Sequence, residues 1–186
     1  MSANPVSATP VPGTAITGCL APIDKDGLMD LIAKGKADPK AVKTLKCKTV
    51  AEGRFRHLNY IRNLPPYIVD EPPGLLGDDT APNPSEASLA ALGSCIAVGI
   101  HANAVARNIT IRKLELQLEA DINITAVWGT GDTSPKPVGF DAVRIKVDLD
   151  ADAPKEDLDA LVQHVKKWSP VANTFMKPVG VDVVLG

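Results

Sequence analysis

Cys95 is the residue of this chain whose side chain is best suited to chemistry. A cysteine thiolate is a strong nucleophile, and it is the form of the side chain that oxidants attack. Cys95 ends a run of small and apolar residues that begins at Asn83 and carries a single acid, Glu86. The adjacent Gly93 and Ser94 leave space beside the thiol. Cys95 is therefore either a packed, inert thiol or a nucleophile with room for a substrate.

The residues around Cys95 predict one long helix. Asn83 and Pro84 favour a helix start, because proline suits the first helical turn. The run to residue 107 is apolar almost all the way round, which predicts a buried, central helix. Glu86 and Cys95 are nine residues apart, about 13 Å along such a helix and half a turn out of phase. The two side chains cannot meet on one straight helix. If both serve one site, an arginine must bridge them or a second subunit must supply one of them.

The remaining elements predict an α+β fold with antiparallel sheets around the central helix. The periodicity that supports this is clearest after the helix, where apolar residues alternate and change phase at Arg112-Lys113, as at a bulge. The predicted elements are short helices over 27–34, capped by Asp26, and from Asp38 to Leu45; one or two strands in 47–63; a strand at 67–69; a loop over 70–84; strands over 109–124 and 143–149; a polar turn at 129–137; an amphipathic helix from Asp152 to Trp168, with Trp168 on its apolar stripe; and a last strand over 179–185.

The composition is typical of a soluble globular protein. The chain has 186 residues, of which 45% are hydrophobic and 23% are charged, with a net charge of −2 and a pI near 5.9. This balance excludes bulk electrostatic binding to nucleic acid. No apolar run is expected to reach the ~20 residues of a membrane span, so no membrane partner is predicted. Residues 1–23 have neither the basic nor the apolar region of a signal peptide and are interpreted as a flexible leader.

The cysteines indicate a reducing environment. Cys19, Cys47 and Cys95 are odd in number and widely spaced, so they form no disulfide framework and no Cys-x-x-Cys metal site. A cytoplasmic location is therefore expected.

The histidines indicate neither a metal site nor a base for the thiol. His101 lies six residues after Cys95 and is too far round the helix to contact it. His57 and His164 have no metal-ligand spacing. No metal and no cofactor are predicted.

Five segments resemble the OsmC/Ohr family of bacterial thiol-dependent hydroperoxide reductases, and more closely its OsmC-like branch. The resemblance covers about 46–186, which is predicted to be one OsmC-like domain, preceded by a helical extension over 24–45. The segments are Asp-Glu-Pro-Pro at 70–73, Gly-Asp-Asp-Thr at 77–80, Asn-Pro-x-Glu at 83–86, Leu-Ala-Ala-Leu-Gly-Ser-Cys at 89–95 and Ser-Pro-Val-Ala-Asn-Thr at 169–174.

The resemblance implies a peroxidatic thiolate at Cys95, activated by an arginine that Glu86 orients. The arginine is expected from the strand before the Pro-Pro break, with Arg62 as the first choice and Arg54 and Arg56 as alternatives. The resemblance also implies an intertwined homodimer with sites at the subunit interface. A role in oxidative and osmotic stress, a small apolar organic hydroperoxide as substrate and an external thiol as reductant follow from the same resemblance.

The sequence departs from the enzymatic members of the family at Ser169. Those members carry a resolving cysteine at the start of the second block, and a serine cannot close that disulfide. Cys19 and Cys47 are not in matching positions. One hypothesis is therefore a one-cysteine hydroperoxide reductase whose oxidised Cys95 is reduced from outside. The alternative is a protein of the same fold that has lost turnover and binds a small apolar ligand at the dimer interface. A purely structural stress protein has no sequence feature in its favour.

Overall fold

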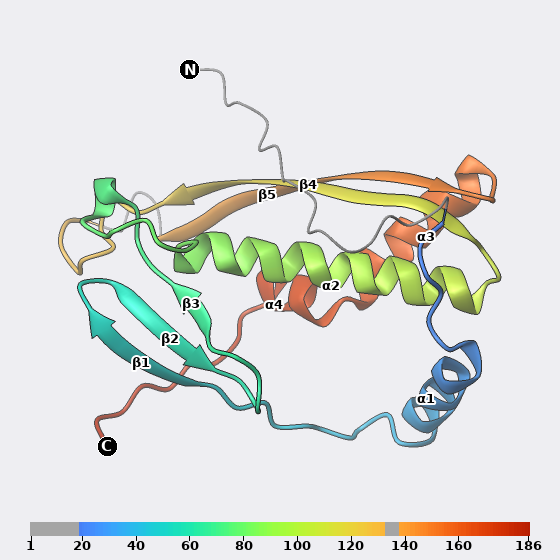
Figure 1. Cartoon of the computed structure of the whole chain (residues 1–186), viewed down its shortest axis with the longest axis horizontal. Coiled ribbons are helices and arrows are strands. Elements are labelled where there is room, and N and C mark those ends of the chain that lie inside the picture. Colours follow the sequence, from blue (N-terminus) through green and yellow to red (C-terminus); the bar gives the residue numbers. More distant parts are fainter. Residues whose placement is uncertain (1–18, 133–137) are drawn as a thin grey trace.

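The computed structural model describes residues 19–132 and 138–186 and is organised around one long helix, α2 (Figure 1). Most of the predicted leader, and residues 133–137 of the predicted polar turn, lie outside the described residues. In chain order the elements are α1 (Lys25–Ala37), β1 (Lys48–Gly53), β2 (Arg56–Tyr60), β3 (Tyr67–Val69), the 3-10 helix η1 (Pro73–Leu75), α2 (Pro84–Ala106), β4 (Ile111–Asn123), β5 (Gly139–Ala151), α3 (Lys155–Trp168) and α4 (Pro170–Met176).

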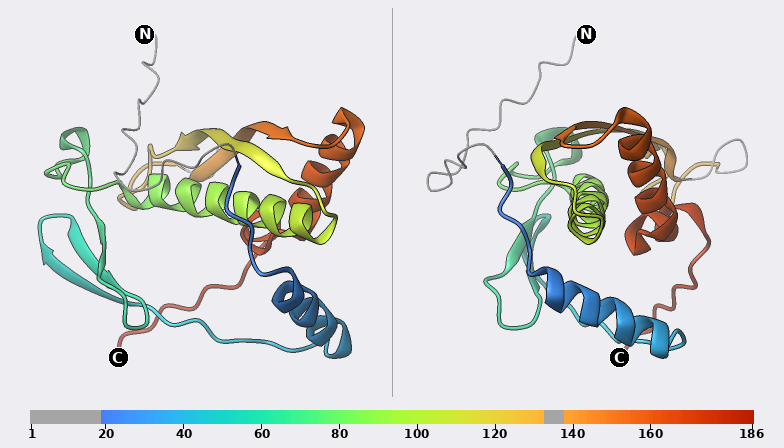
Figure 2. Two further views of the ribbon diagram at one scale, coloured as in Figure 1. Left: turned by 45° about the vertical axis from the view of Figure 1, so that its right-hand side comes forward. Right: turned by 90° about the vertical axis from the view of Figure 1, so that its right-hand side faces the viewer.

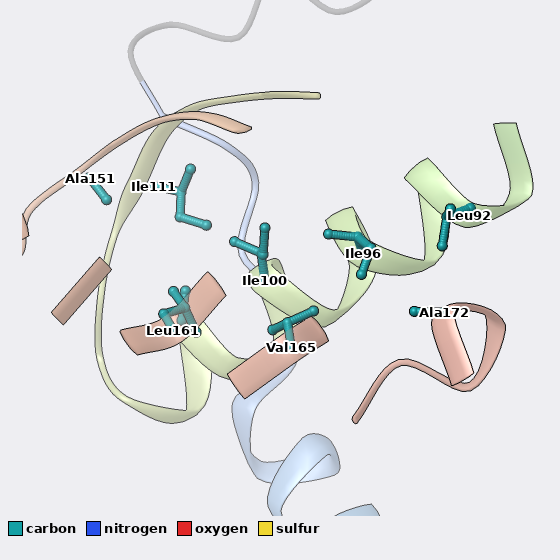
Figure 3. Close-up of a cluster of buried hydrophobic side chains, with 9 residues drawn as sticks. Leu92, Ile96, Ile100, Ile111, Ala151, Leu161, Val165 and Ala172 are labelled. Carbon is teal, nitrogen blue, oxygen red and sulfur yellow. The ribbon is translucent and has the colours of Figure 1, made fainter. Parts of the chain in front are cut away.

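Helix α2 forms where the sequence predicted it and supplies the main line of core residues. Its buried side chains recur every fourth residue, which places them on one face of the helix. Figure 3 shows this face against side chains of β4, β5, α3 and α4. The core consists of Leu92, Ile96, Ile100, Ala104, Ile111, Ala151, Leu161, Val165 and Ala172.

Two glycines let the neighbouring elements approach α2 closely. A Cβ atom at Gly93 would lie 2.8 Å from Leu118 Cδ1 of β4. A Cβ atom at Gly99 would lie 2.5 Å from Val165 Cγ1 of α3. Both distances are shorter than real carbon contacts, so the small residues seen in the sequence are needed for packing on two sides of the helix.

Strands β4 and β5 form a long antiparallel hairpin that covers α2 (Figures 1 and 2). The register shifts between Ile111 and Lys113, which confirms the bulge predicted from the change of phase. One face of the hairpin packs on the core, and the other carries cross-strand ion pairs such as Arg144–Asp121. Apolar and polar residues therefore alternate along β4 and β5 because one face of the hairpin packs on the core and the other faces solvent, as the sequence analysis predicted.

The other sheet, in the order β1-β2-β3, is antiparallel and stands to one side of α2 (Figure 1). Strand β1 is exposed along its whole length. In one chain, no other element covers β1. The sequence had predicted that both sheets pack around the helix.

The predicted last strand is wrong for a single chain. Residues 177–186 carry no secondary structure and run away from the body as a tail (Figure 1). Val181 and Val183 are 81% and 89% exposed. The alternating valines pair with no strand among the described residues, and a strand needs such a partner.

Three local predictions for the helices are also corrected. Helix α1 is capped by Asp24 rather than Asp26. The second short helix is absent, since residues 38–47 form a turn and a fully exposed irregular link, in which the apolar side chains of Val42 and Leu45 remain unburied. In α3, Leu161 and Val165 are buried as the stripe predicted, but Trp168 is 65% exposed.

The prediction that α2 is buried all round is wrong for one chain. Ala90, Ala91, Ser94 and Val98 are exposed, and Val98 is 69% exposed. The expectation that no segment has the length and hydropathy of a membrane span is also wrong, because α2 has 23 residues and contains a stretch with a mean hydropathy of 1.7. Its leucine, isoleucine and valine residues raise the hydropathy, and one of its faces packs in the core, as in the core helix of a soluble protein.

Candidate functional site

Cys95 and Ser169 meet in the folded chain although they are 74 residues apart. The Ser169 hydroxyl donates a hydrogen bond to Cys95 Sγ at 3.1 Å. Ser169 is 4% exposed and Cys95 is half-buried. This hydrogen bond joins α2 to the junction of α3 and α4. The pair is the best candidate for a chemical site among the described residues.

Ser169 is held in place by the corner between α3 and α4. Its amide donates to the carbonyl of Val165 at 2.8 Å, which closes the end of α3. Its hydroxyl oxygen accepts a hydrogen bond from the amide of Ala172 at 3.1 Å, which makes Ser169 the N-cap of α4. With its oxygen fixed by that amide, the hydroxyl proton is free to point at the sulfur.

A mainly apolar cavity of about 300 Å³ is lined by close neighbours of this pair, although neither Cys95 nor Ser169 itself lines it. Leu92 and Ile96 flank Cys95 in the sequence of α2 and line the cavity, and Ala172 of α4 lines it opposite them (Figure 3). Its remaining lining residues are Val143, Ile145, Val147, Val162, Gln163, Lys166, Phe175 and Met176. An apolar molecule of small size fits such a lining better than water does.

Cys95 lies at the boundary between the two faces of α2. Leu92 and Ile96 belong to the buried face, whereas Ser94 and Val98 belong to the exposed face. Cys95, between them, is half-buried. Cys95 therefore borders the core on one side and the exposed face of α2 on the other.

Glu86 has a structural task at the start of α2. Its carboxylate accepts a hydrogen bond from the amide of Asn83 at 2.9 Å, and the Asn83 side chain accepts one from the amide of Glu86 at 2.9 Å. This reciprocal pair is a capping box. Glu86 is exposed, sits in the first turn, and is separated from Cys95 by nine residues of one helix, so a single chain does not bring the two together.

Substitutions at Glu86 are expected to test its capping role. Glu86→Ala removes the capping box and lowers the free energy of unfolding by about 1 kcal/mol in urea titrations. Glu86→Gln keeps an acceptor for the Asn83 amide, so its unfolding free energy stays close to that of the wild type. A glutamine variant as unstable as the alanine variant would contradict this assignment of the cap.

The three candidate arginines have different environments. Arg54 pairs with Asp78 at 2.5 Å. Arg56 binds Glu52 at 2.8 Å and Thr80. Arg62 lies in the turn between β2 and β3 with a positive φ of 55°, is exposed, and makes no ion pair within the described part of the chain. No hydrogen bond joins any of the three to Cys95 within this chain.

The loop before α2 contains two carboxyl groups, Asp70 and Glu71, to which the sequence analysis assigned no role. Asp70 is 0% exposed and accepts hydrogen bonds from the hydroxyl and the amide of Thr80, at 2.7 and 3.1 Å. These bonds lower the pKa of Asp70 to about 2. A Cβ atom at Gly77 would lie 1.8 Å from the carbonyl oxygen of Glu71, so only glycine fits this tight loop. In the sequence, the available signal for this contact was a carboxyl group at Asp70 and a hydroxyl group at Thr80, ten residues later.

Glu71 is the second of these groups, and its Oε2 atom is buried with no hydrogen-bond partner within the described residues. Burial raises the pKa of Glu71, the carboxylates of Glu86 and Asp70 raise it further, and His57 opposes them. The folded state therefore keeps the proton of Glu71 at a pH where the unfolded chain has lost it.

Glu71→Gln is expected to stabilise the protein at neutral pH. Because the pKa of Glu71 is raised on folding, ionisation costs stability as the pH rises from the unfolded value of 4.5 through the folded value. The neutral amide avoids this cost, so the variant gains stability at pH 7 and loses the gain below pH 4.5. Urea unfolding at both pH values measures this. The exposed Glu156→Gln serves as the control, and an equal gain in that variant would contradict the role of burial.

The comparisons with known proteins concern the fold. A family model described as OsmC-like protein matches residues 77–184, which include Glu86, Cys95 and Ser169 but not the three arginines. No curated protein matches the sequence.

Three similar solved structures have low sequence identity. An OsmC-like protein from Mycoplasma pneumoniae has 16% identity and a TM-score of 0.62, with 73% of this chain and 89% of that chain covered. An OsmC-like protein of unknown function from Vibrio cholerae has 10% identity and a TM-score of 0.56, with 72% and 94% covered. The organic hydroperoxide resistance protein OsmC from Legionella pneumophila has 20% identity and a TM-score of 0.50, with 73% and 91% covered. At such identities the likeness shows a shared α+β fold with antiparallel sheets and a long central helix.

Proposed function

Because the chain belongs to the OsmC-like protein family, we propose that it is a thiol-dependent organic hydroperoxide reductase whose one peroxidatic residue is Cys95. The observation that carries this proposal is the hydrogen bond from Ser169 Oγ to Cys95 Sγ, at 3.1 Å, beside an apolar cavity. The name of the Legionella relative, an organic hydroperoxide resistance protein, supports the same chemistry. Fold alone does not define an activity, so the proposal depends on the site.

The reaction begins with attack of the Cys95 thiolate on the terminal oxygen of the hydroperoxide. The O–O bond breaks as the S–O bond forms, and the alkoxide takes up a proton and leaves as the alcohol. Sulfur loses two electrons and becomes the sulfenic acid, while the hydroperoxide gains them. An arginine side chain near the sulfur would favour the thiolate over the thiol. Arg62, which has no partner among the residues described, is our candidate, oriented by Glu86.

An external thiol completes the cycle. It attacks the sulfenic sulfur, forms a mixed disulfide with Cys95 and releases water, and a second thiol then restores the Cys95 thiol. Ser169 cannot act as an internal resolving group, because a hydroxyl forms no disulfide. Cys19 and Cys47 are exposed free thiols on other parts of the chain. Free thiols at these positions are in keeping with a reducing, cytoplasmic location.

The cavity beside Cys95 favours an apolar hydroperoxide as substrate. Its lining is mainly aliphatic, and its volume of about 300 Å³ is at the lower limit of ordinary ligand pockets. The direct test is the consumption of cumene hydroperoxide by the protein with a dithiol reductant, followed together with the release of one alcohol per hydroperoxide. If the cavity binds the hydroperoxide but no thiol-dependent consumption occurs, the peroxidase proposal fails, and the alternative of a ligand-binding protein without turnover replaces it.

We also propose that the protein works as a homodimer with its sites at the subunit interface. In one chain the small-residue face of α2, strand β1 and the valine-rich tail 177–186 all lack cover. A second copy would bury the exposed face of α2 and could offer a strand edge to the tail. It would also bring Arg62 and Glu86 of the second copy toward Cys95. Within one chain, a straight α2 keeps Glu86 away from Cys95.

A charge on the exposed face of α2 is expected to break the dimer and the activity together. Val98→Asp places a carboxylate where the proposal buries a valine, so light scattering is expected to give a monomer that reduces hydroperoxide at least about tenfold more slowly. The matched control is Val42→Asp, at a residue that is 91% exposed in the link before β1. This variant is expected to change neither the oligomeric state nor the rate of hydroperoxide reduction. A monomer with full activity would exclude a site shared between two chains.

A further inference from the structure

The segment from Lys34 to Lys48 concentrates positive charge that the whole-chain balance conceals. It contains six lysines and one acid, Asp38, a formal charge of +5. Because the whole chain carries −2, the rest of the protein carries −7. The six are Lys34, Lys36, Lys40, Lys43, Lys46 and Lys48. The net charge of the whole chain is therefore negative, whereas this segment is strongly positive.

All residues of this lysine segment are exposed, and its lysines are free of partners. Within residues 19–132 and 138–186, none of the six makes an ion pair or a side-chain hydrogen bond. Two other surface lysines are paired, Lys113 with Asp148 and Lys155 with Asp159. The positive charge of the segment is thus not neutralised by the protein itself.

The segment runs along one side of the molecule. It begins in the last turn of α1, continues through the irregular link and ends at the first residue of β1. Figures 1 and 2 show this link along the side opposite the β4–β5 hairpin, where no other helix or strand of the chain covers it. A flat, extended partner can therefore approach several lysines together.

Two apolar side chains accompany the lysines and indicate the kind of partner. Val42 and Leu45 are 91% and 93% exposed and lie among Lys40, Lys43 and Lys46. Lysines attract an anionic lipid surface additively, and apolar side chains beside them can enter its boundary with the acyl chains. The segment has no arginine and no aromatic residue, the side chains that bind single-stranded nucleic acid by stacking.

We propose that the lysine segment is a docking surface for lipid bilayers with anionic headgroups. The interaction is peripheral, since it depends on exposed lysines and two small apolar side chains, and it does not depend on the chemistry at Cys95. It differs from the sequence-based expectation of no membrane partner, which considered only a membrane span and the net charge of the chain.

The test is sedimentation of the full chain with vesicles. Binding is expected to vesicles of phosphatidylcholine mixed with phosphatidylglycerol and not to vesicles of phosphatidylcholine alone. It is expected to disappear near 1 M salt, where the Debye length falls to about 3 Å. The triple variant Lys40→Gln, Lys43→Gln, Lys46→Gln is expected to bind on the order of 100-fold more weakly.

A second triple variant controls for net charge. Lys146→Gln, Lys155→Gln and Lys167→Gln remove the same charge from β5 and α3 and are expected to leave vesicle binding unchanged. Thermal unfolding followed by circular dichroism establishes that both triple variants fold. Equal binding to the two kinds of vesicle, or equal effects of the two variants, would overturn the proposal. So would lysine-dependent binding to a single-stranded oligonucleotide that exceeds binding to the vesicles.

Discussion

Replacing Cys95 by serine is expected to slow thiol-dependent reduction of cumene hydroperoxide by at least about 10³-fold, to the level of the reductant alone. A hydroxyl at this position has neither the acidity nor the polarisable sulfur that attack on an O–O bond requires. The substitution keeps nearly the same size in a half-buried position, so the fold is expected to persist. The rate is measured as loss of hydroperoxide under excess dithiol, and thermal unfolding serves as the check on structure.

The matched control is the double variant Cys19→Ser, Cys47→Ser, which leaves Cys95 as the only thiol. Both substituted cysteines are exposed, so this variant is expected to fold and to retain the wild-type rate. It should take up one oxygen atom per chain when treated with hydroperoxide without reductant, seen by mass spectrometry. Loss of activity in the double variant, with Cys95 intact, would show that another thiol takes part in turnover.

Substituting Ser169 by cysteine is expected to change how the oxidised protein is resolved. Since the Ser169 oxygen lies 3.1 Å from the Cys95 sulfur, a cysteine there needs to move by only about 1 Å to reach the 2.05 Å of a disulfide. One equivalent of hydroperoxide is then expected to remove two thiols per chain, with a mass loss of two hydrogens, instead of leaving a sulfenic acid. Mass spectrometry and thiol titration of the denatured protein measure this outcome.

The variant also has a structural cost. Ser169 caps α4, and replacing the hydroxyl oxygen weakens the bond from the Ala172 amide, by about 1 kcal/mol in unfolding free energy. Ser169→Ala separates the two effects, because it loses the cap and cannot form the disulfide. Persistence of the sulfenic acid in the cysteine variant would contradict the closeness of the two side chains after oxidation.

The periodic elements were the part of the fold that the sequence predicted well. Helix α2, the hairpin β4–β5 and its bulge depend on apolar residues repeating with the helical or strand period, and this signal lies within each segment. The predictions failed where a segment depends on a distant surface. The tail 177–186 has the pattern of a strand but pairs with no strand among the described residues, and the segment after Asp38 has a helix start but leaves its apolar side chains unburied.

The features of the candidate site fall into the same two groups, those predictable from the sequence and those that depend on tertiary structure. Cys95 on a long apolar helix, and its separation from Glu86, could be determined from the sequence, because both follow from residue types and the rise of a helix. The hydrogen bond between Cys95 and Ser169, the buried oxygen of Glu71 and the uncovered face of α2 were decided only by the tertiary structure. Contacts between residues far apart in the chain depend on how whole elements pack, and no local pattern of residues carries that information.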